Sequence, residues 1–217
     1  MRGKFLLVAL IFTFSIFMYA DFAEAALFDF NTLIAGDLSS QIEAYMEVVY
    51  GSNIDVTGGQ VYTTQILGPD SYVRNDGTGT EPPLVIKFTA TPLTSIQFEA
   101  GVFGISYIGN PDFELEVFDS SHNPVNITNG GGAEIPGGTS YVISGNQWWW
   151  YTNYQTNMRA LSPRLIFSSP VYELRFHNDY ATHIGIDNLD VAPVPEPASM
   201  LLLGMGILGI FGLRKKM

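Results

Sequence analysis

Phe113-Glu114-Leu115-Glu116-Val117-Phe118 alternates apolar and acidic side chains over six residues. Successive side chains of a β-strand point to opposite faces, so this pattern predicts a strand with one buried and one solvated face. Residues 171–176 alternate in the same way and are predicted to form another strand.

Short apolar runs elsewhere predict further strands. They cover residues 84–89, 95–98, 101–108, 141–143 and 165–167. Clusters of glycine, proline and asparagine separate these runs, as turns between short strands require. This density of strands and turns favours an antiparallel β-sandwich or barrel over an α/β fold.

One helix is predicted near the start of the domain. Apolar side chains recur from Leu38 to Val49 at the spacing i, i+4, i+7, i+8 and i+11, which places them on one helical face. Ser40 and Glu43 have the spacing of a capping box. The sequence therefore predicts a helix over residues 37–49 that ends at Gly51.

The N-terminus has the pattern of a secretory signal peptide. Arg2 and Lys4 form a positively charged region, residues 5–20 form an apolar region, and Ala23 and Ala25 are the small residues of a cleavage site. We expect cleavage after Ala25, so that residues 1–25 are removed. An uncleaved anchor is the alternative, and the two alanines disfavour it.

The C-terminal segment 194–217 combines three features in order. The tripeptide Pro195-Glu196-Pro197 is followed by an uncharged apolar run over 198–213 and by the basic residues 214–216. The run is slightly shorter than the ~20 residues of a typical transmembrane helix. Helix is nonetheless its expected form in lipid, with the basic tip on the cytoplasmic side.

This order resembles the PEP-CTERM sorting signal, which exosortase-type membrane proteases read in bacteria that make extracellular polysaccharide. The resemblance implies cleavage at or near Pro195, Glu196 and Pro197. It also implies an inner-membrane intermediate, anchored through the C-terminal helix, and final delivery to the cell surface or extracellular matrix. An ordinary tail anchor is the alternative, but it has no need of the tripeptide.

Residues 26–193 are the expected ectodomain, and they are strongly acidic. Of the 21 acidic and 10 basic residues of the chain, three acids and five bases lie outside this segment, which leaves it a net charge of −13. Such a charge repels nucleic acid, so we expect no nucleic-acid partner. The chain has no cysteine, which excludes disulfides and thiolate metal sites.

The best candidate for ligand contact is the aromatic run Trp148, Trp149, Trp150 and Tyr151. Alternation along a strand makes at least one tryptophan point away from its neighbours: either Trp148 and Trp150 face the core and Trp149 and Tyr151 face outward, or the reverse. An exposed aromatic ring beside amide side chains suits a sugar, so we predict carbohydrate contact by these four residues. The alternative is that the run only fills the core.

The segment 183–191 resembles the closing strand of jelly-roll modules, including carbohydrate-binding ones and the ectodomains of PEP-CTERM proteins. The resemblance predicts a jelly-roll-like β-sandwich. It also implies a structural Ca²⁺ site in which Asp187 joins oxygens from the first residues, here Asp29 or Asp37. The apolar alternation breaks at Asp187 and Asn188, which indicates a β-bulge. The alternative role of Asp187 is to cap the backbone of that bulge.

Catalysis has little support in the sequence. There is no GxSxG or HExxH motif. The acidic pair Glu114 and Glu116 is explained by a solvated strand face. We therefore predict a non-enzymatic, exported surface or matrix protein that binds polysaccharide. The alternatives are a self-associating structural protein of the surface or biofilm and, less favoured, a polysaccharide hydrolase.

Overall fold

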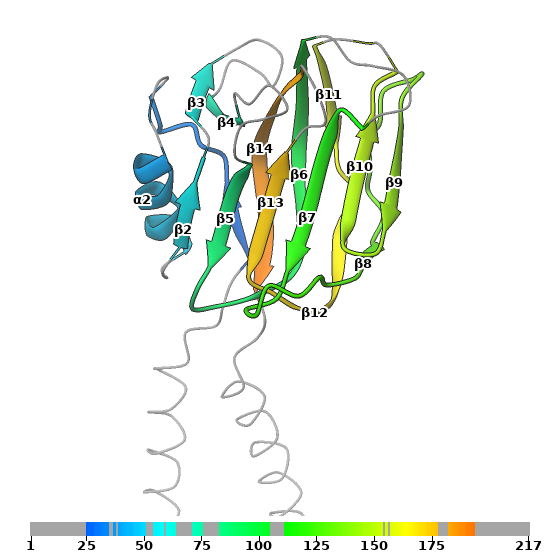
Figure 1. Ribbon diagram of the computed structural model, residues 1–217. Coiled ribbons are helices and arrows are strands. Elements are labelled where there is room, and N and C mark those ends of the chain that lie inside the picture. The colour runs from blue at the N-terminus through cyan, green and yellow to red at the C-terminus, as the bar shows by residue number, and fades with distance from the viewer. Residues whose placement is uncertain are drawn as a thin grey trace, which may run out of the picture. The chain divides into compact units, whose positions relative to one another are not determined.

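Two antiparallel β-sheets packed face to face make up the described part of the chain (Figure 1). The computed structural model describes residues 25–34, 37, 39–50, 54–58, 60–63, 71–75, 83–104, 111–153, 155, 157–177 and 182–193. The predicted sorting signal 194–217, its helix over 198–213 and almost all of the signal peptide lie outside these residues. Ala25, the first described residue, is exposed.

One sheet has six strands. In order across the sheet they are β2 (Ile54–Thr57), β5 (Leu84–Phe88), β13 (Glu173–His177), β7 (Phe113–Phe118), β10 (Gln147–Tyr151) and β9 (Ser140–Ser144). β7 coincides with the strand predicted from alternation. Its Phe113, Leu115 and Val117 are buried, while Glu114 and Glu116 point away from the core.

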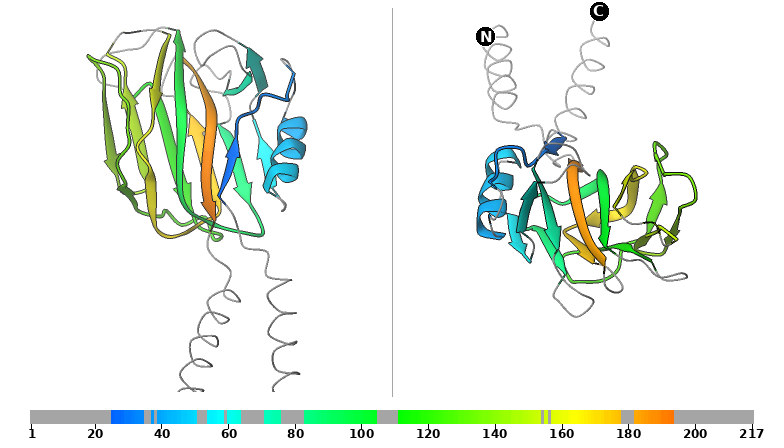
Figure 2. Two further views of the ribbon diagram at one scale, coloured as in Figure 1. Left: turned by 180° about the vertical axis from the view of Figure 1, so that it is seen from behind. Right: turned by 90° about the horizontal axis from the view of Figure 1, so that it is seen from above.

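The other sheet has eight strands. Its main order is β3 (Gln60–Thr63), β4 (Ser71–Asn75), β14 (Thr182–Pro193), β6 (Leu93–Gly104), β12 (Leu165–Val171) and β8 (Ile127–Asn129). β1 (Ala26–Phe28) pairs with β14, and β11 (Met158–Leu161) pairs with β6. Seen from behind, β14 runs between β4 and β6 (Figure 2). The predicted antiparallel, jelly-roll-like β-sandwich is confirmed.

Two of the predicted strands have different limits. Residues 171–176 are not one strand, because β12 ends at Val171 in the eight-stranded sheet and β13 begins at Glu173 in the other. Tyr172 lies at this crossing, where its N–H donates to the carbonyl of Phe118. Conversely, the runs 95–98 and 101–108 belong to one strand, β6, as far as Gly104, since Glu99 and Ala100 stay paired with β14. Residues 105–108 lie outside the described part.

The helix α2 (Ser39–Tyr50) confirms the predicted N-terminal helix, and it buries Ile42 and Met46. It lies beside β2, at one end of the six-stranded sheet (Figure 1). The predicted capping box is wrong, because Ser40 donates to the Gln41 side chain. Glu43 instead accepts the N–H of Val56. Among the described residues, no helix is long and apolar enough to cross a membrane.

The core between the sheets is rich in aromatic side chains. Phe98 of β6 lies at its centre, with ring centroids 5.4–5.7 Å from those of Phe113, Trp148 and Phe176. All four side chains are fully buried. These contacts fix which face of β10 is buried, and therefore which aromatic residues of that strand face outward.

Candidate functional site

The side of the six-stranded sheet that points away from the core, here called the outer face, carries the polar and half-exposed aromatic residues. On β10 the odd-numbered residues, including Trp149 and Tyr151, lie on this face. On the neighbouring strands it is formed by Glu114 and Glu116 of β7 and by His177 of β13. The register places Glu114 between Trp149 and His177.

Trp148 and Trp150 do not reach the outer face, which corrects the prediction of carbohydrate contact for these two residues. Both are 0% exposed. Trp148 packs edge-on against Phe98 and Phe113, and Trp150 donates its indole N–H to Thr139. A ligand at the surface cannot contact either ring. The prediction of carbohydrate contact now rests on Trp149 and Tyr151.

Trp149 is partly exposed on the outer face and lies between Glu114 of β7 and Val142 of β9 in the strand register. Its indole nitrogen is buried and has no hydrogen-bond partner among the described residues. Val142 is 42% exposed, so the surface beside the ring is open on the β9 side. A ligand can therefore approach Trp149 over apolar surface on one side and over carboxylates on the other.

The carboxylates beside Trp149 are held by a small polar network. The His177 Nε2 atom lies 3.3 Å from Glu114 and 3.6 Å from Glu116. Gln147 donates its amide to Glu116 at 2.9 Å. Burial, and next the negative charge of Glu114, raise the pKa of Tyr151. The network thus fixes two carboxylates close to the exposed aromatic residues of β10.

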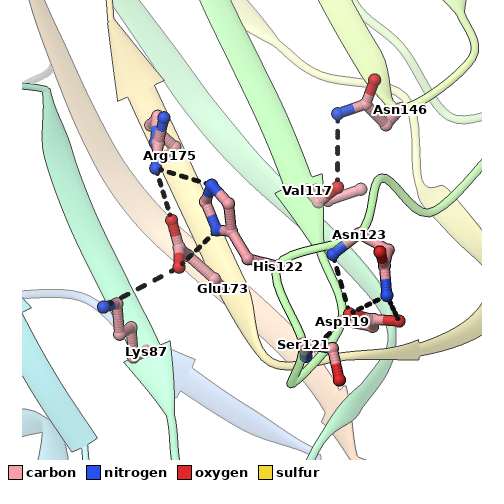
Figure 3. Close-up of polar contacts among 9 residues, drawn as sticks. All are labelled: Lys87, Val117, Asp119, Ser121, His122, Asn123, Asn146, Glu173 and Arg175. Carbon is pink, nitrogen blue, oxygen red and sulfur yellow. Dashed lines mark hydrogen bonds and ion pairs between the residues drawn. The ribbon is translucent and has the colours of Figure 1, made fainter.

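A second polar cluster lies on the outer face at the start of β13, around Glu173 (Figure 3). Glu173 is only 7% exposed. Its carboxylate lies 2.9 Å from the Arg175 guanidinium, 3.3 Å from His122 Nδ1 and 3.8 Å from the Lys87 ammonium. A buried carboxylate is costly unless it is paired, and these groups supply the pairing.

His122 reaches this cluster from the loop after β7. The loop is built on Asp119, whose carboxylate accepts the N–H groups of Ser121 and Asn123 and the Asn123 side-chain amide. These bonds, those of Asn123 first, lower the pKa of Asp119. The His122 ring stacks on Phe118 with centroids 4.4 Å apart.

A surface pocket of about 430 Å³ lies beside the Glu173 cluster. Its lining includes Lys87, His122 and Glu173 of the cluster, together with Asp119, Ser120 and Tyr172. Sequence reasoning missed this site, since His122 and Glu173 are far apart in the chain. Its only sequence signal was a pair of oppositely charged residues, Glu173 and Lys87. They lie at outward positions of two strands that pair with each other.

Asp187 lies at a β-bulge, which confirms the predicted break in strand β14. The register with β6 shifts between Asp187 and Asp190, and Asn188 has a φ of 47°. The carboxylate of Asp187 is buried and accepts the N–H of Asn188 at 2.7 Å. Asp187 thus caps the backbone of the bulge, the alternative role considered for it.

The oxygens expected to complete a calcium site have other partners. β1 does pair with β14, so the first and last strands are adjacent. Asp29, however, accepts the Tyr45 hydroxyl, and Asp37 accepts the N–H of Ile34. The described residues include no group of three or more acidic or histidine side chains that could hold a metal ion. Calcium binding by Asp187 stays a prediction.

Comparison with known proteins identifies the C-terminal segment. Residues 193–216 match the family model of the PEP-CTERM protein-sorting motif. The match confirms the predicted sorting signal and supports an exported exosortase substrate that passes through a membrane-anchored intermediate. No curated protein sequence matches the chain.

Among solved structures, the CBM22-1 xylan-binding domain from Paenibacillus barcinonensis Xyn10C is similar to this chain. The sequence identity is 12% and the TM-score 0.33, over 82% of this chain and 97% of that domain.

Proposed function

We propose that residues 26–193 form an exported domain that binds polysaccharide at the cell surface or in the extracellular matrix, with Trp149 as its main contact. The observation that carries this proposal is the division of β10 into two faces. Trp148 and Trp150 are completely buried, whereas Trp149 and Tyr151 lie on the outer face, beside fixed hydrogen-bonding groups. Core packing explains the aromatic side chains at positions 148 and 150, but it does not explain those at positions 149 and 151.

The chemistry of the outer face suits a sugar chain. A sugar ring offers C–H groups on its faces and hydroxyls around its rim. The ring of Trp149 supplies an apolar surface for the first, and Glu114, Glu116 and Gln147 supply acceptors and a donor for the second. Because Glu116 is already hydrogen-bonded to Gln147, these groups need little reordering when a ligand binds.

The charges on this face bear on the type of polysaccharide. Glu114 and Glu116 lie on the β7 side of Trp149 in a domain whose net charge is −13. Like charges at a binding surface weaken association. We therefore expect neutral polysaccharides to be preferred over those rich in uronic acids.

The test is retention of the mature protein on the extracellular polysaccharide of the producing bacterium, measured by affinity electrophoresis. We expect Trp149→Ala to weaken retention by about tenfold or more, as for loss of a central aromatic contact. Ile166→Ala is the matched control, because Ile166 is 43% exposed on the other sheet. Equal retention of both variants would contradict the proposal.

Melting temperatures measured with calcium and with chelator test the proposed role of Asp187. If Asp187 holds a structural calcium ion, chelator lowers the melting temperature of the natural protein and leaves that of Asp187→Asn unchanged. If chelator changes both melting temperatures equally, or changes neither, Asp187 acts only as a cap of the backbone.

A further inference from the structure

Strand β9 (Ser140–Ser144) lies at the end of the six-stranded sheet, with β10 as its only strand partner among the described residues. On its other side its backbone makes no hydrogen bond to any described residue. A strand edge with free N–H and C=O groups is a template for another strand.

Two other sheet ends have backbone groups that are hydrogen-bonded, whereas β9 meets β8 through a side-chain hydrogen bond from Asn129 to the Tyr141 hydroxyl. At β2 the carboxylates of Glu43 and Glu47, both on α2, accept the N–H groups of Val56 and Ile54. At β8 the N–H of Ile127 donates to the carbonyl of Gly145 in the turn between β9 and β10. The fold therefore blocks strand addition at these two ends by specific side-chain and loop contacts.

The chain segment that contains β9 also lacks charge. Residues 135–158 contain no aspartate, glutamate, lysine, arginine or histidine, although the domain carries a net charge of −13. Two copies of such a domain repel each other over most of their surface. Strand β9 itself therefore presents no charge to a second copy.

The sequence of β9 is complementary to itself in an antiparallel pairing. With Val142 opposite Val142 of a second copy, Ser140 lies opposite Ser144, and Tyr141 lies opposite Ile143. Tyr141 and Ile143 are partly buried and pack against the core, and Val142 is 42% exposed. Aromatic and β-branched residues are favourable cross-strand neighbours.

We propose that β9 pairs antiparallel with β9 of a second copy of this chain, in the register that places the two Val142 residues opposite each other. The two six-stranded sheets then become one continuous twelve-stranded sheet. The contact is short, because five residues span about 17 Å. It belongs to the class of weak, transient interfaces, which become populated when many copies share one surface.

Disulfide crosslinking tests the register, because the natural chain has no cysteine. In the proposed pairing, residues 142 of the two copies lie about 4.5–5.5 Å apart between Cα atoms, within disulfide range. Residues 140 of the two copies lie about 14 Å apart, beyond it. The full-length Val142→Cys and Ser140→Cys variants are expressed in the producing bacterium and oxidised on the cells. Covalent dimers are then compared on non-reducing gels.

We expect at least about fivefold more covalent dimer from Val142→Cys than from Ser140→Cys, whose exposed residue controls for random collision. The double variant Ser140→Cys/Ser144→Cys restores crosslinking, because its cysteines face each other across the pair. Equal crosslinking of the two single variants would overturn the proposed register. Crosslinking of Val142→Cys only to a different protein would assign the edge to another partner.

Charge substitutions give an independent test by sedimentation of the mature protein. Ser140→Lys/Ser144→Lys places like charges opposite each other and is expected to raise the dissociation constant about tenfold or more. Ser140→Glu/Ser144→Lys places opposite charges together and is expected to keep or strengthen association. Association unchanged in the first variant, or lost equally in both, would overturn the proposal. Equal melting temperatures verify that both variants are folded.

Discussion

The two faces of the six-stranded sheet use the same strands for different purposes. On the inner face, Trp148 and Phe113 are completely buried in the aromatic core. On the outer face, Trp149 and Glu114 alternate with them in sequence and remain partly exposed. Strand alternation separates the residues that pack in the core from the residues that reach the outer surface. It also predicts how substitutions on the two faces should differ.

The largest expected effect is that of Trp148→Ala, on the inner face. Removing a buried tryptophan costs about 3–5 kcal/mol of the free energy of unfolding, because the core cannot close around the cavity. Trp149→Ala, one residue away, is expected to cost about 1–2 kcal/mol, since its ring is only partly buried. Urea denaturation of the two variants measures the difference. Similar losses in stability would mean that Trp149 is a core residue and that the two faces do not differ in their contribution to stability.

An intermediate effect is expected for Glu173, which lies on the outer face but is buried. Glu173→Gln removes the negative charge that faces Lys87, His122 and Arg175. We expect a loss of about 1–3 kcal/mol in the free energy of unfolding. The control is Glu134→Gln at an exposed position, expected to change it by no more than about 0.5 kcal/mol. If Glu173→Gln leaves the free energy of unfolding unchanged, the cluster does not stabilise the domain.

The smallest effect is expected at Asp119, at the edge of the outer face. Its folded-state pKa lies below the ordinary value of 3.8, since the charged form accepts hydrogen bonds from Asn123 and Ser121. Its stabilising contribution is therefore present above about pH 4 and is lost as the pH falls through the folded-state pKa. The melting temperature of Asp119→Asn should lie below that of the natural protein at pH 6. This gap should narrow as the pH falls below about 4, whereas a constant gap would exclude titration of Asp119 as the cause.

The sequence predicts those features that depend on neighbouring residues. Alternation in 113–118 predicts β7 and its buried face, and the interruption at Asp187 and Asn188 predicts the bulge in β14. The helical spacing predicts α2 to within two residues of each end. Each of these patterns is local, so the residues that decide the structure are visible together.

The features that were missed depend on contacts between distant segments. Alternation along β10 leaves open which tryptophans are buried, because Phe98 of the opposite sheet decides it. Glu43 has the spacing of a helix cap but accepts an N–H from β2 instead. The pairing of His122 with Glu173 joins a loop to a strand that lies 51 positions later. No local pattern encodes these pairings.

The position of β14 has a consequence for the order of events during export. β14 joins β1, β4 and β6, and it ends at Pro193, one residue short of the PEP tripeptide. Its contacts with β1 span more than 160 positions of sequence, which makes folding slow and dependent on the end of the chain. The eight-stranded sheet is therefore incomplete until almost the whole ectodomain is available for folding. We expect the chain to remain unfolded, as translocation requires, until the residues next to the sorting signal reach the membrane.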